Sequence, residues 1–376
     1  MSGGVRHLYV HLPFCAHRCG YCDFVTVVGR QGEHGAYVDA LLAELELERS
    51  VLAPQLETVF VGGGTPTFTA ACELRRLLSA LPSAPEVTVE ANPETITPAI
   101  ASLLRESGVS RVSLGAQTFD PTLLSVLERV AGPDDVRRAF YHLRDAGFDN
   151  ISLDLIYGTP GQSPAALDAD IDEALALGPE HLSYYELEAK PGTRFTHRHG
   201  AELAQQADAL EGYFERVVER LTAAGYRWYE TANFCRPPET AGGRDLRAHH
   251  NLAYWHGRDY LGIGLGAVST VDGRRRRNTP RLPVYVAALA RGVRPPREVE
   301  ELPLEIRRRE RVMLGLRLDE PLPLLGLGPV LDRDALARLE KLELVARDGG
   351  AAEGEALLLT RRGRFLGGGV TAELLA

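Results

Sequence analysis

The stretch HLPFCAHRCGYCDF (residues 11–24) places three cysteines, Cys15, Cys19 and Cys22, within eight positions, directly after the apolar run LYVHL (8–12). A disulfide requires an even number of thiols, and a structural zinc site usually has four protein ligands. A 4Fe–4S cube has four irons, for which cysteine thiolate is the usual protein ligand. The spacing CxxxCxxC therefore favours a cluster that is held at three irons and leaves the fourth open to an exchangeable ligand.

S-adenosylmethionine can be that ligand, because its amino and carboxylate groups can chelate the open iron. Reductive cleavage of the bound molecule would then give a 5′-deoxyadenosyl radical, which is cofactor chemistry that a protein positions and shields. Two alternatives remain open for the three cysteines. They could form a zinc site completed by His11 or His17, or they could be unrelated buried thiols.

The composition indicates a globular protein of a reducing compartment. The chain has 376 residues, 44% of them hydrophobic and 25% charged, with a formal net charge of −9. This balance does not favour a nucleic-acid partner. Five cysteines are few, odd in number and clustered, and no signal peptide or apolar stretch of bilayer length is apparent, so we expect a cytoplasmic location. Cys72 and Cys235 are expected to pack as small apolar residues.

Short apolar runs rich in β-formers alternate with amphipathic helical patterns through the first half of the chain. This alternation predicts βαβ units and a parallel sheet, in the form of a barrel or partial barrel. The predicted strands are 8–12, 58–62, 87–91, 111–117, 151–158 and 181–188, with a final strand over 226–234. In such a fold the active site lies at the carboxyl ends of the strands, which is where the cysteine loop and GGGTP (62–66) fall.

Several motifs of the chain resemble the radical S-adenosylmethionine superfamily, and within it the branch of oxygen-independent coproporphyrinogen oxidases and HemW-type heme chaperones. The motifs are YVHLPFCAHRCGYCDF (9–24), GGGTPTF (62–68), VTVEANPE (87–94), SLGAQTFD (113–120), LERV (127–130) and SLDLIYG (152–158). The resemblance runs from about Tyr9 to the C-terminus. It implies a radical-SAM partial (β/α) barrel, similar to a TIM barrel, with a C-terminal extension of the HemN type.

The resemblance also implies a set of S-adenosylmethionine contacts, while no catalytic residue is assigned. These contacts are Tyr9, Tyr21, Gly63, Gly64, Thr65, Glu90, Gln117, Arg129 and Asp154. Glu90 and Asp154 have an independent rationale, because an unpaired carboxylate in an apolar strand is costly. A structural ion pair with an arginine such as Arg129 is the alternative for both. The chain has Ala131 where the family commonly has a histidine, and YGTPGQ (157–162) where YGLPGQ is common.

Two features favour the chaperones of this branch over the oxidases. The oxidases carry a fourth cysteine at the position of Phe24, and they have an extension before the cysteine loop, whereas this chain starts its first strand within ten residues. HNLAYW (250–255) matches the HNxxYW motif of the chaperones. In a helix, His250 and Tyr254 would share one face, and Asn251 and Trp255 a neighbouring one.

By this resemblance, His250, Asn251, Tyr254 and Trp255 are expected to contact haem. Histidine and tyrosine can ligate haem iron, and tryptophan offers a flat apolar surface to the macrocycle. The alternative is an ordinary helix start with a polar cap and two interior aromatic residues. Which atom would meet the iron is left open.

Three regions are predicted. Residues 1–235 form the barrel core, 236–303 a connecting segment with the HNLAYW motif, and 304–376 a winged-helix-like domain of helices followed by a hairpin. The arginine-rich runs RRRR (274–277) and RRRER (307–311) are interpreted as solvated faces.

The resulting hypothesis is a heme chaperone that binds a 4Fe–4S cluster, S-adenosylmethionine and haem, and passes haem to an acceptor, expected to be a haem-dependent respiratory protein. The acceptor could bring the chain transiently to a membrane. The oligomeric state, a homodimer included, stays open. The alternatives are a radical enzyme that acts on a tetrapyrrole, such as a coproporphyrinogen oxidase, and a non-catalytic zinc protein.

Overall fold

The computed structural model describes residues 4–188, 190, 194–351 and 354–375. Within them, the central sheet has nine strands in the order β11-β1-β4-β5-β6-β7-β8-β10-β9. Its strands are β1 (His7–Leu12), β4 (Thr58–Gly63), β5 (Glu86–Ala91), β6 (Arg111–Gln117), β7 (Ile151–Tyr157), β8 (His181–Glu186), β9 (Arg227–Trp228), β10 (Asn233–Cys235) and β11 (Leu261–Gly264). The sheet is parallel from β11 to β8 and remains open, so the predicted α/β partial barrel is confirmed.

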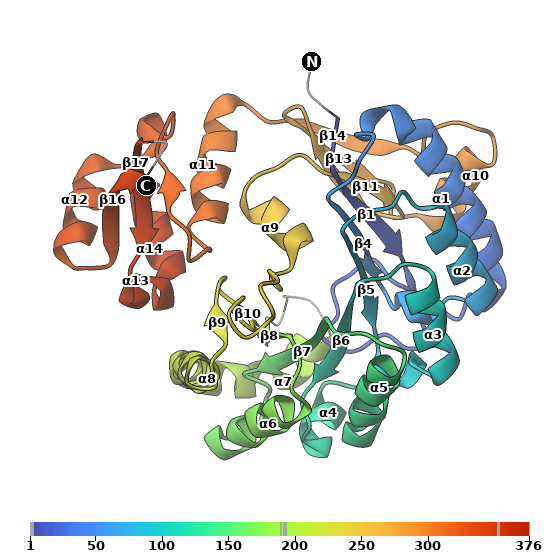
Figure 1. Cartoon of the computed structure of the whole chain (residues 1–376), viewed down its shortest axis with the longest axis horizontal. Helices are drawn as coiled ribbons and strands as arrows, with labels where there is room; N and C mark the ends of the chain where they lie inside the picture. Colours follow the sequence, from blue (N-terminus) through green and yellow to red (C-terminus); the bar gives the residue numbers. More distant parts are fainter. Residues whose placement is uncertain (1–3, 189, 191–193, 352–353, 376) are drawn as a thin grey trace.

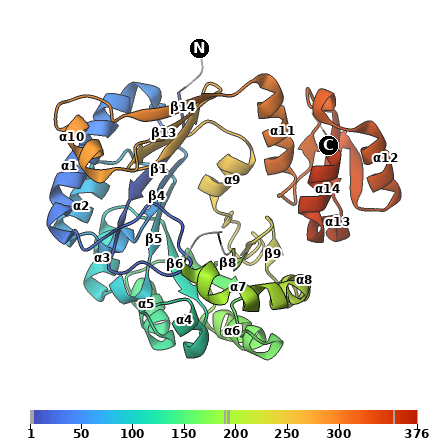
Figure 2. The same cartoon turned by 180° about the vertical axis from the view of Figure 1, so that it is seen from behind.

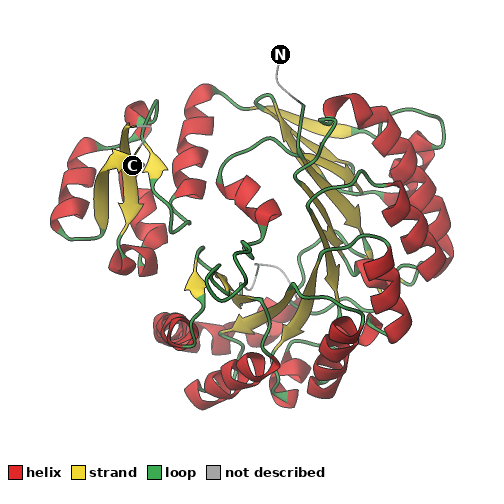
Figure 3. Cartoon of the chain, in the orientation of Figure 1, coloured by secondary structure: helices red, strands yellow, loops and turns green. Residues whose placement is uncertain are grey.

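Helices cover the convex side of this sheet (Figures 1 and 3). They are α1 (His34–Glu48), α2 (Ala71–Ala80), α3 (Pro98–Glu106), α4 (Pro121–Val126), α5 (Pro133–Asp145), α6 (Pro164–Leu177) and α8 (Leu210–Ala223), whereas Phe195 of α7 (Arg194–Gln206) packs against Tyr21 of the cysteine loop. Four of them start with proline, whose missing N–H costs nothing in the first turn. The side chains of Thr97, Asp120 and Ser163 cap three of these starts. Strand residues such as Val10, Val61 and Leu153 are fully buried, as parallel sheets require.

The predicted strand over 226–234 is wrong in one respect, because the chain reverses within it. β9 and β10 are two short antiparallel strands, and β10 pairs antiparallel with β8. The Glu230 carboxylate stabilises the reversal by accepting from the backbone N–H of Ala232 at 3.0 Å and from Asn233 Nδ2 at 2.6 Å. In the sequence, Glu230 is the single acidic residue of the stretch 226–234, and it lies where the chain turns.

Residues 236–303 contribute to the barrel and to a second sheet. The segment starts with α9 (His249–Trp255), and β11 then returns to pair with β1. The second sheet has the order β12-β13-β14, and α10 lies between β13 and β14 in the chain. The elements are β12 (Val268–Val271), β13 (Arg274–Asn278), α10 (Leu282–Leu289) and β14 (Arg297–Glu301). Arg274 and Arg275 of the RRRR run lie opposite Glu301 and Glu300 and pair with them. Treating 236–303 as a separate connecting segment stays a prediction.

The C-terminal part has its own apolar core around Val312, Leu336 and Leu357. Its elements are α11 (Leu304–Gly315), β15 (Leu322–Pro323), α12 (Arg333–Lys341), β16 (Val345–Ala351), β17 (Gly354–Leu359), α13 (Arg361–Phe365) and α14 (Gly367–Leu374), and the small sheet has the order β15-β17-β16. It lies across the molecule from α1 and α2 (Figure 2). Among the described residues, no helix is long and apolar enough to cross a membrane.

Candidate functional site

The cysteine loop lies at the carboxyl end of β1. Cys15 ends the short strand β2 (Phe14–Cys15), which pairs with β3 (Val27–Val28), and Cys22 N–H donates to the Cys19 carbonyl at 3.2 Å. Cys15 Sγ lies 3.5 Å from the Thr65 hydroxyl, and Arg129 Nη1 lies 3.7 Å from Cys19 Sγ. Burial raises the pKa of the Cys15 and Cys22 thiols, so their thiolates require a compensating positive charge. Arg129 supplies one such charge, and bound iron would supply more.

The donor set of the loop fits an iron–sulfur cube. Cysteine thiolate is the usual protein ligand of such a cube, and each thiolate binds a different iron. Three thiols on one loop, with a guanidinium beside one of them, suit such a cube.

The glycine-rich loop after β4 lies against the cysteine loop. A Cβ at Gly64 would come within 2.6 Å of the Pro13 carbonyl oxygen, and one at Gly63, where φ is +117°, within 2.5 Å of the His11 ring. Only glycine fits both places. Gly63 N–H donates to Glu90 Oε2 at 2.9 Å, and burial raises the pKa of Glu90 to about 7, with the charge of Asp154 adding to that effect.

Asn92, which belongs to the VTVEANPE motif at the end of β5, joins these parts, although no ligand contact is predicted for it. Its Nδ2 donates to the Thr65 hydroxyl at 2.9 Å, and its Oδ1 accepts from Arg129 Nη2 at 2.9 Å. Arg129 Nη2 also donates to the Gly115 carbonyl at 3.1 Å. The signal was available, because Asn92 is the first polar residue after β5.

The predicted carboxylates are held without ion pairs. Neither Glu90 nor Asp154 pairs with Arg129 or with another basic side chain of the described residues. Asp154 accepts instead from Ser113 Oγ at 2.7 Å and from Ser152 Oγ at 3.0 Å. Two of the remaining predicted residues border the same end of the sheet. Gln117 has φ of +66° at a bulge that ends β6, and the Tyr21 ring packs edge-on against Phe195.

An aromatic row runs along the concave side of the sheet from the cysteine loop toward α9. His11 Nε2 lies 2.8 Å from the Val25 carbonyl, so this nitrogen carries the proton, and Nδ1 accepts from the Tyr9 hydroxyl at 2.9 Å. The Tyr9 ring stacks on Phe60 at 6.1 Å, and Phe60 stacks on His250 at 5.2 Å. The row connects Tyr9 with the HNLAYW motif.

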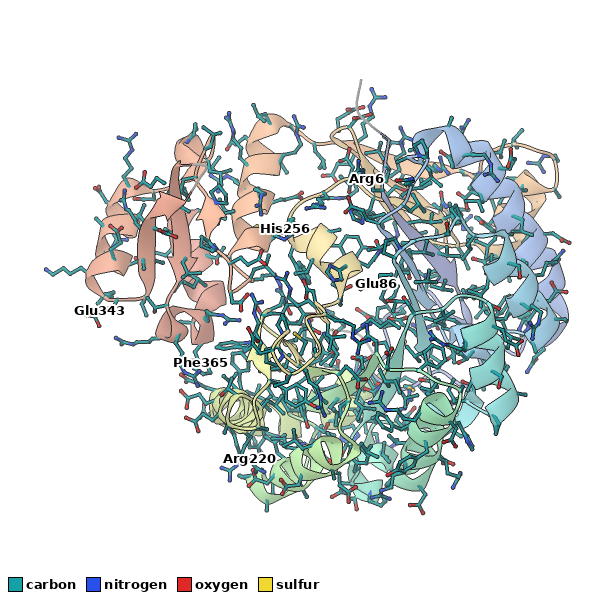
Figure 4. All side chains as sticks on the ribbon, viewed as in Figure 1. Arg6, Glu86, Arg220, His256, Glu343 and Phe365 are labelled. Atoms are coloured by element: carbon teal, nitrogen blue, oxygen red, sulfur yellow. The ribbon has the colours of Figure 1, made fainter. Side chains whose placement is uncertain are left out.

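The HNLAYW motif forms α9, whose start is fixed to the amino ends of the strands. The Glu86 carboxylate of β5 accepts from the N–H groups of His249 and His250, both at 2.9 Å, and Figure 4 shows Glu86 beside this helix. His250 Nδ1 lies 2.8 Å from the hydroxyl of Thr58, the first residue of β4, and Nε2 lies 2.8 Å from the Tyr254 hydroxyl. His250 is 1% exposed, and burial lowers its pKa to about 3.

A second chain of hydrogen bonds links α9 with Asp154. Ala248 N–H donates to the Tyr229 hydroxyl at 3.1 Å, and Tyr229 lies 2.7 Å from His181 Nε2. His181 Nδ1 lies 2.8 Å from Ser152 Oγ, which donates to Asp154. All of these groups are buried except Asp154, which is partly exposed. The residue before the motif is thereby connected to a predicted S-adenosylmethionine contact.

Comparison with known proteins identifies the family. The sequence profile of the Radical SAM superfamily matches residues 9–174. The chain is 39% identical to the heme chaperone HemW of Mycobacterium tuberculosis H37Rv, over 100% of this chain and 96% of that protein. This chain belongs to the HemW heme chaperone family. HemW of Bacillus subtilis 168 is 36% identical over 83% of each chain, and HemW of Escherichia coli K12 is 36% identical over 72% of each.

The fold of this family member is shared with an enzyme of the same branch. The solved structure of coproporphyrinogen III oxidase (HemN) from Escherichia coli, described as a radical SAM enzyme, matches with a TM-score of 0.78. The match covers 99% of this chain and 91% of that one, at 23% sequence identity. It shows the common architecture of the barrel and the C-terminal part.

The predicted residues fall into two groups in this HemW-family fold. The cysteines, Gly63, Gly64, Thr65, Glu90, Gln117 and Arg129 lie at the carboxyl ends of the strands. His250 reaches the amino ends, and Tyr9 lies between the two groups, because its ring stacks on Phe60, which stacks on His250. Glu86, Thr58, His181 and Tyr229, which fix α9, were not predicted, because they meet the motif only in the folded chain.

Proposed function

We propose that this chain is a heme chaperone that binds haem and transfers it to an acceptor protein. The proposal rests on one observation above all, the 39% identity to HemW of Mycobacterium tuberculosis along the full length of the chain. The acceptor is proposed to be a haem-dependent respiratory protein that brings the chaperone to the membrane for the transfer. A homodimer stays a proposal for the oligomeric state, and a cytoplasmic location for the free chaperone.

We further propose that Cys15, Cys19 and Cys22 hold a 4Fe–4S cluster with S-adenosylmethionine at the open iron. When bound, this pair of cofactors supplies one-electron cleavage of S-adenosylmethionine. The amide of Gly63 and the carboxylate of Glu90 are placed to meet the polar end of the methionyl group, and Thr65 and Arg129 to fix the cluster thiolates. Tyr9, Tyr21, Gly64, Gln117 and Asp154 complete the proposed S-adenosylmethionine contacts.

The cluster is tested with single cysteine variants reconstituted anaerobically. We expect Cys15→Ser, Cys19→Ser and Cys22→Ser each to lose the visible absorbance of the cluster together with iron and sulfide. Cys72→Ser and Cys235→Ser are the matched controls, because Cys72 is exposed and Cys235 lies in a different core cluster. Stoichiometric zinc without sulfide in the parent protein would favour the zinc alternative, and equal loss in Cys235→Ser would exclude the three-cysteine site.

We propose that His250, Asn251, Tyr254 and Trp255 form a haem contact. His250 can reach haem iron only after one of its two ring hydrogen bonds opens, because Thr58 and Tyr254 occupy both nitrogens. Trp255, at the other end of α9, is partly exposed and needs no such opening. The motif therefore has a partly exposed tryptophan, Trp255, at one end and a buried histidine, His250, whose ring nitrogens are both hydrogen-bonded, at the other.

A pair of histidine variants tests this contact by haem titration. His250→Ala should weaken haem binding and change the visible spectrum of the complex, with the cluster retained, because the two sites use separate chain segments. His249→Ala is the control, since its side chain is 42% exposed and pairs with Asp245 rather than with Thr58 or Tyr254. Parent-like affinity and spectra in both variants would show that HNLAYW serves only the fold.

A coproporphyrinogen oxidase is the second candidate function, because the fold of HemN is shared. Phe24 opposes it, since the oxidases of this branch carry a cysteine there, and its side chain is 62% exposed beside the cysteine loop. We expect no conversion of coproporphyrinogen by the reconstituted protein with S-adenosylmethionine and a reductant. Formation of protoporphyrinogen would overturn the chaperone assignment.

A further inference from the structure

A cavity of about 590 Å³ lies between the barrel and the C-terminal part, and the cysteine loop contributes no residue to its lining. Phe214 of α8 and Trp228 of β9 line it from the barrel. Phe365 of α13 and residues of α11 and α14 line it from the other side, and Figure 4 shows Phe365 at this junction. Ligand sites of small molecules have volumes of roughly 300–1,000 Å³ and favour such junctions.

The apolar wall of this cavity is aromatic. The rings of Phe214 and Trp228 lie 5.7 Å apart and those of Trp228 and Phe365 5.2 Å apart, and Phe214 meets Phe365 edge-on at 5.4 Å. The rings meet edge-on or tilted, and Arg364 covers one face of Trp228, so the wall offers apolar ring edges rather than a flat stacking surface.

The polar part of the lining is basic. Arg309, Arg317 and Arg364 line the cavity, and none of the described lining residues is acidic. Arg364 lies 3.6 Å above the Trp228 ring and donates through Nη1 to the Trp228 carbonyl at 2.8 Å. Its Nη2 is buried and has no hydrogen-bond partner among the described residues, and burial lowers the pKa of Arg364 to about 10. A buried guanidinium with a free donor is a strong site for a carboxylate.

The same cavity is connected to the HNLAYW motif. Arg317, which lines it, lies 4.4 Å above the ring of Trp255 and pairs with Glu230 at 2.6 Å. Arg309, Met313 and Leu316 follow one another at helical spacing on α11 and present one face to the cavity. Met313 is 52% exposed, and methionine adapts readily to an apolar ligand.

We propose that this cavity is a preformed seat for haem, in which the macrocycle lies against the apolar lining formed by Phe214, Phe365 and Met313, and its carboxylates meet Arg364 and Arg309. The inference rests on the proposed function, since it takes haem as the cargo, and it adds a binding place that needs no opening of His250. The HNLAYW motif adjoins this seat through Trp255 and Arg317.

Two neighbouring glycines of α14 provide a matched pair of variants. Gly368 lines the cavity and Gly369 does not, and a Cβ added at either one would meet no heavy atom within 4 Å. Gly368→Phe therefore fills the cavity, while Gly369→Phe adds the same side chain outside it. Neither variant removes a hydrogen bond or an ion pair.

The place where haem binds is detected through the methyl signal of Met313. The chain has only two methionines, and the other, Met1, lies outside the described residues. We expect haem added to protein labelled at the methionine methyl groups to shift or broaden the Met313 signal in the parent and in Gly369→Phe. In Gly368→Phe this response should be lost, with haem affinity at this place reduced at least about tenfold.

Four results would overturn the seat, and they differ from one another. Haem that binds by absorbance without changing the Met313 signal would place it elsewhere and leave the chaperone function intact. A response to palmitate but not to haem would assign the cavity to a different apolar anion. Absence of any haem binding by the parent would reject the proposed function together with the seat, whereas an equal Met313 response in Gly368→Phe would reject the seat alone.

Discussion

His181 shows how single buried residues connect the two ends of the barrel. Both of its ring nitrogens are in hydrogen bonds, to Ser152 and to Tyr229, and no atom of the ring faces solvent. Ser152 uses its one proton on Asp154, so its oxygen accepts from His181 Nδ1, and Nε2 accepts from Tyr229. Burial lowers the pKa of His181 well below 6.5, with the charge of Arg111 adding to that effect. The imidazole is therefore neutral in the folded protein.

This neutrality predicts a loss of stability in acid. The unfolded chain binds a proton at His181 near pH 6.5 and the folded chain does not, so the free energy of unfolding falls as the pH drops below 6.5. We expect His181→Gln to lose less stability than the parent between pH 7.5 and 5.5, measured by urea denaturation. His197→Gln, at an exposed histidine, should keep the slope of the parent. An unchanged slope in His181→Gln would contradict the buried neutral form.

At the scale of the element, α9 depends on contacts outside itself. Seven residues are too few for a stable isolated helix. The Glu86 carboxylate compensates for this by accepting two N–H groups of the first turn, where the helix dipole also favours negative charge. The carboxylate is 6% exposed, so water cannot take its place. The position of the HNLAYW motif is thus set from β5.

Glu86→Ala should accordingly destabilise the protein by about 2–4 kcal/mol, because it leaves two buried N–H groups without acceptors. Faster hydrogen exchange at residues 248–255 should accompany this loss. Glu46→Ala is the control, since Glu46 forms a surface pair with Arg49, and it should change stability by about 0.5 kcal/mol or less. Parent-like exchange across α9 in Glu86→Ala would show that the barrel holds the helix by apolar packing alone.

The difference between local signals and contacts that form only on folding also explains what the sequence could predict. Six parallel strands and the cysteine loop were predictable, because apolar runs, proline starts and cysteine spacing are local signals. β11 was not predictable. Its residues LGIG pair with β1 from more than 200 positions away, and they lack the alternation of apolar and polar residues that indicates a strand. The place of Asn92 at a strand end was a local signal, but its contacts with Thr65 and Arg129 exist only after the chain has folded, as does the partnership of Glu86 with His249 and His250.

For the whole molecule, the decisive question is which parts unfold together. Glu44 and Glu48 of α1 are buried and pair with Arg297 of β14 at 2.8 and 2.9 Å. Asn278 and Tyr285 complete the cluster by donating to Glu44 at 2.8 and 2.6 Å. These bonds tie residues 236–303 to the first helix of the barrel. The core around Val312 and Leu357 is separate from this cluster.

Arg297→Met should therefore destabilise the barrel as a unit. It leaves the buried Glu44 carboxylate without a cation, whereas Glu48 keeps its pair with Arg294, and the loss of a buried partner costs about 3–5 kcal/mol. Hydrogen exchange should accelerate together in β1, β11 and β14, while the C-terminal core keeps its protection, because no contact of Arg297 reaches it. Arg274→Met, which breaks an exposed pair with Glu301 on the neighbouring strand, should cost about 1 kcal/mol or less. Faster exchange confined to residues 236–303 would instead make that segment the independent connection that its sequence predicts.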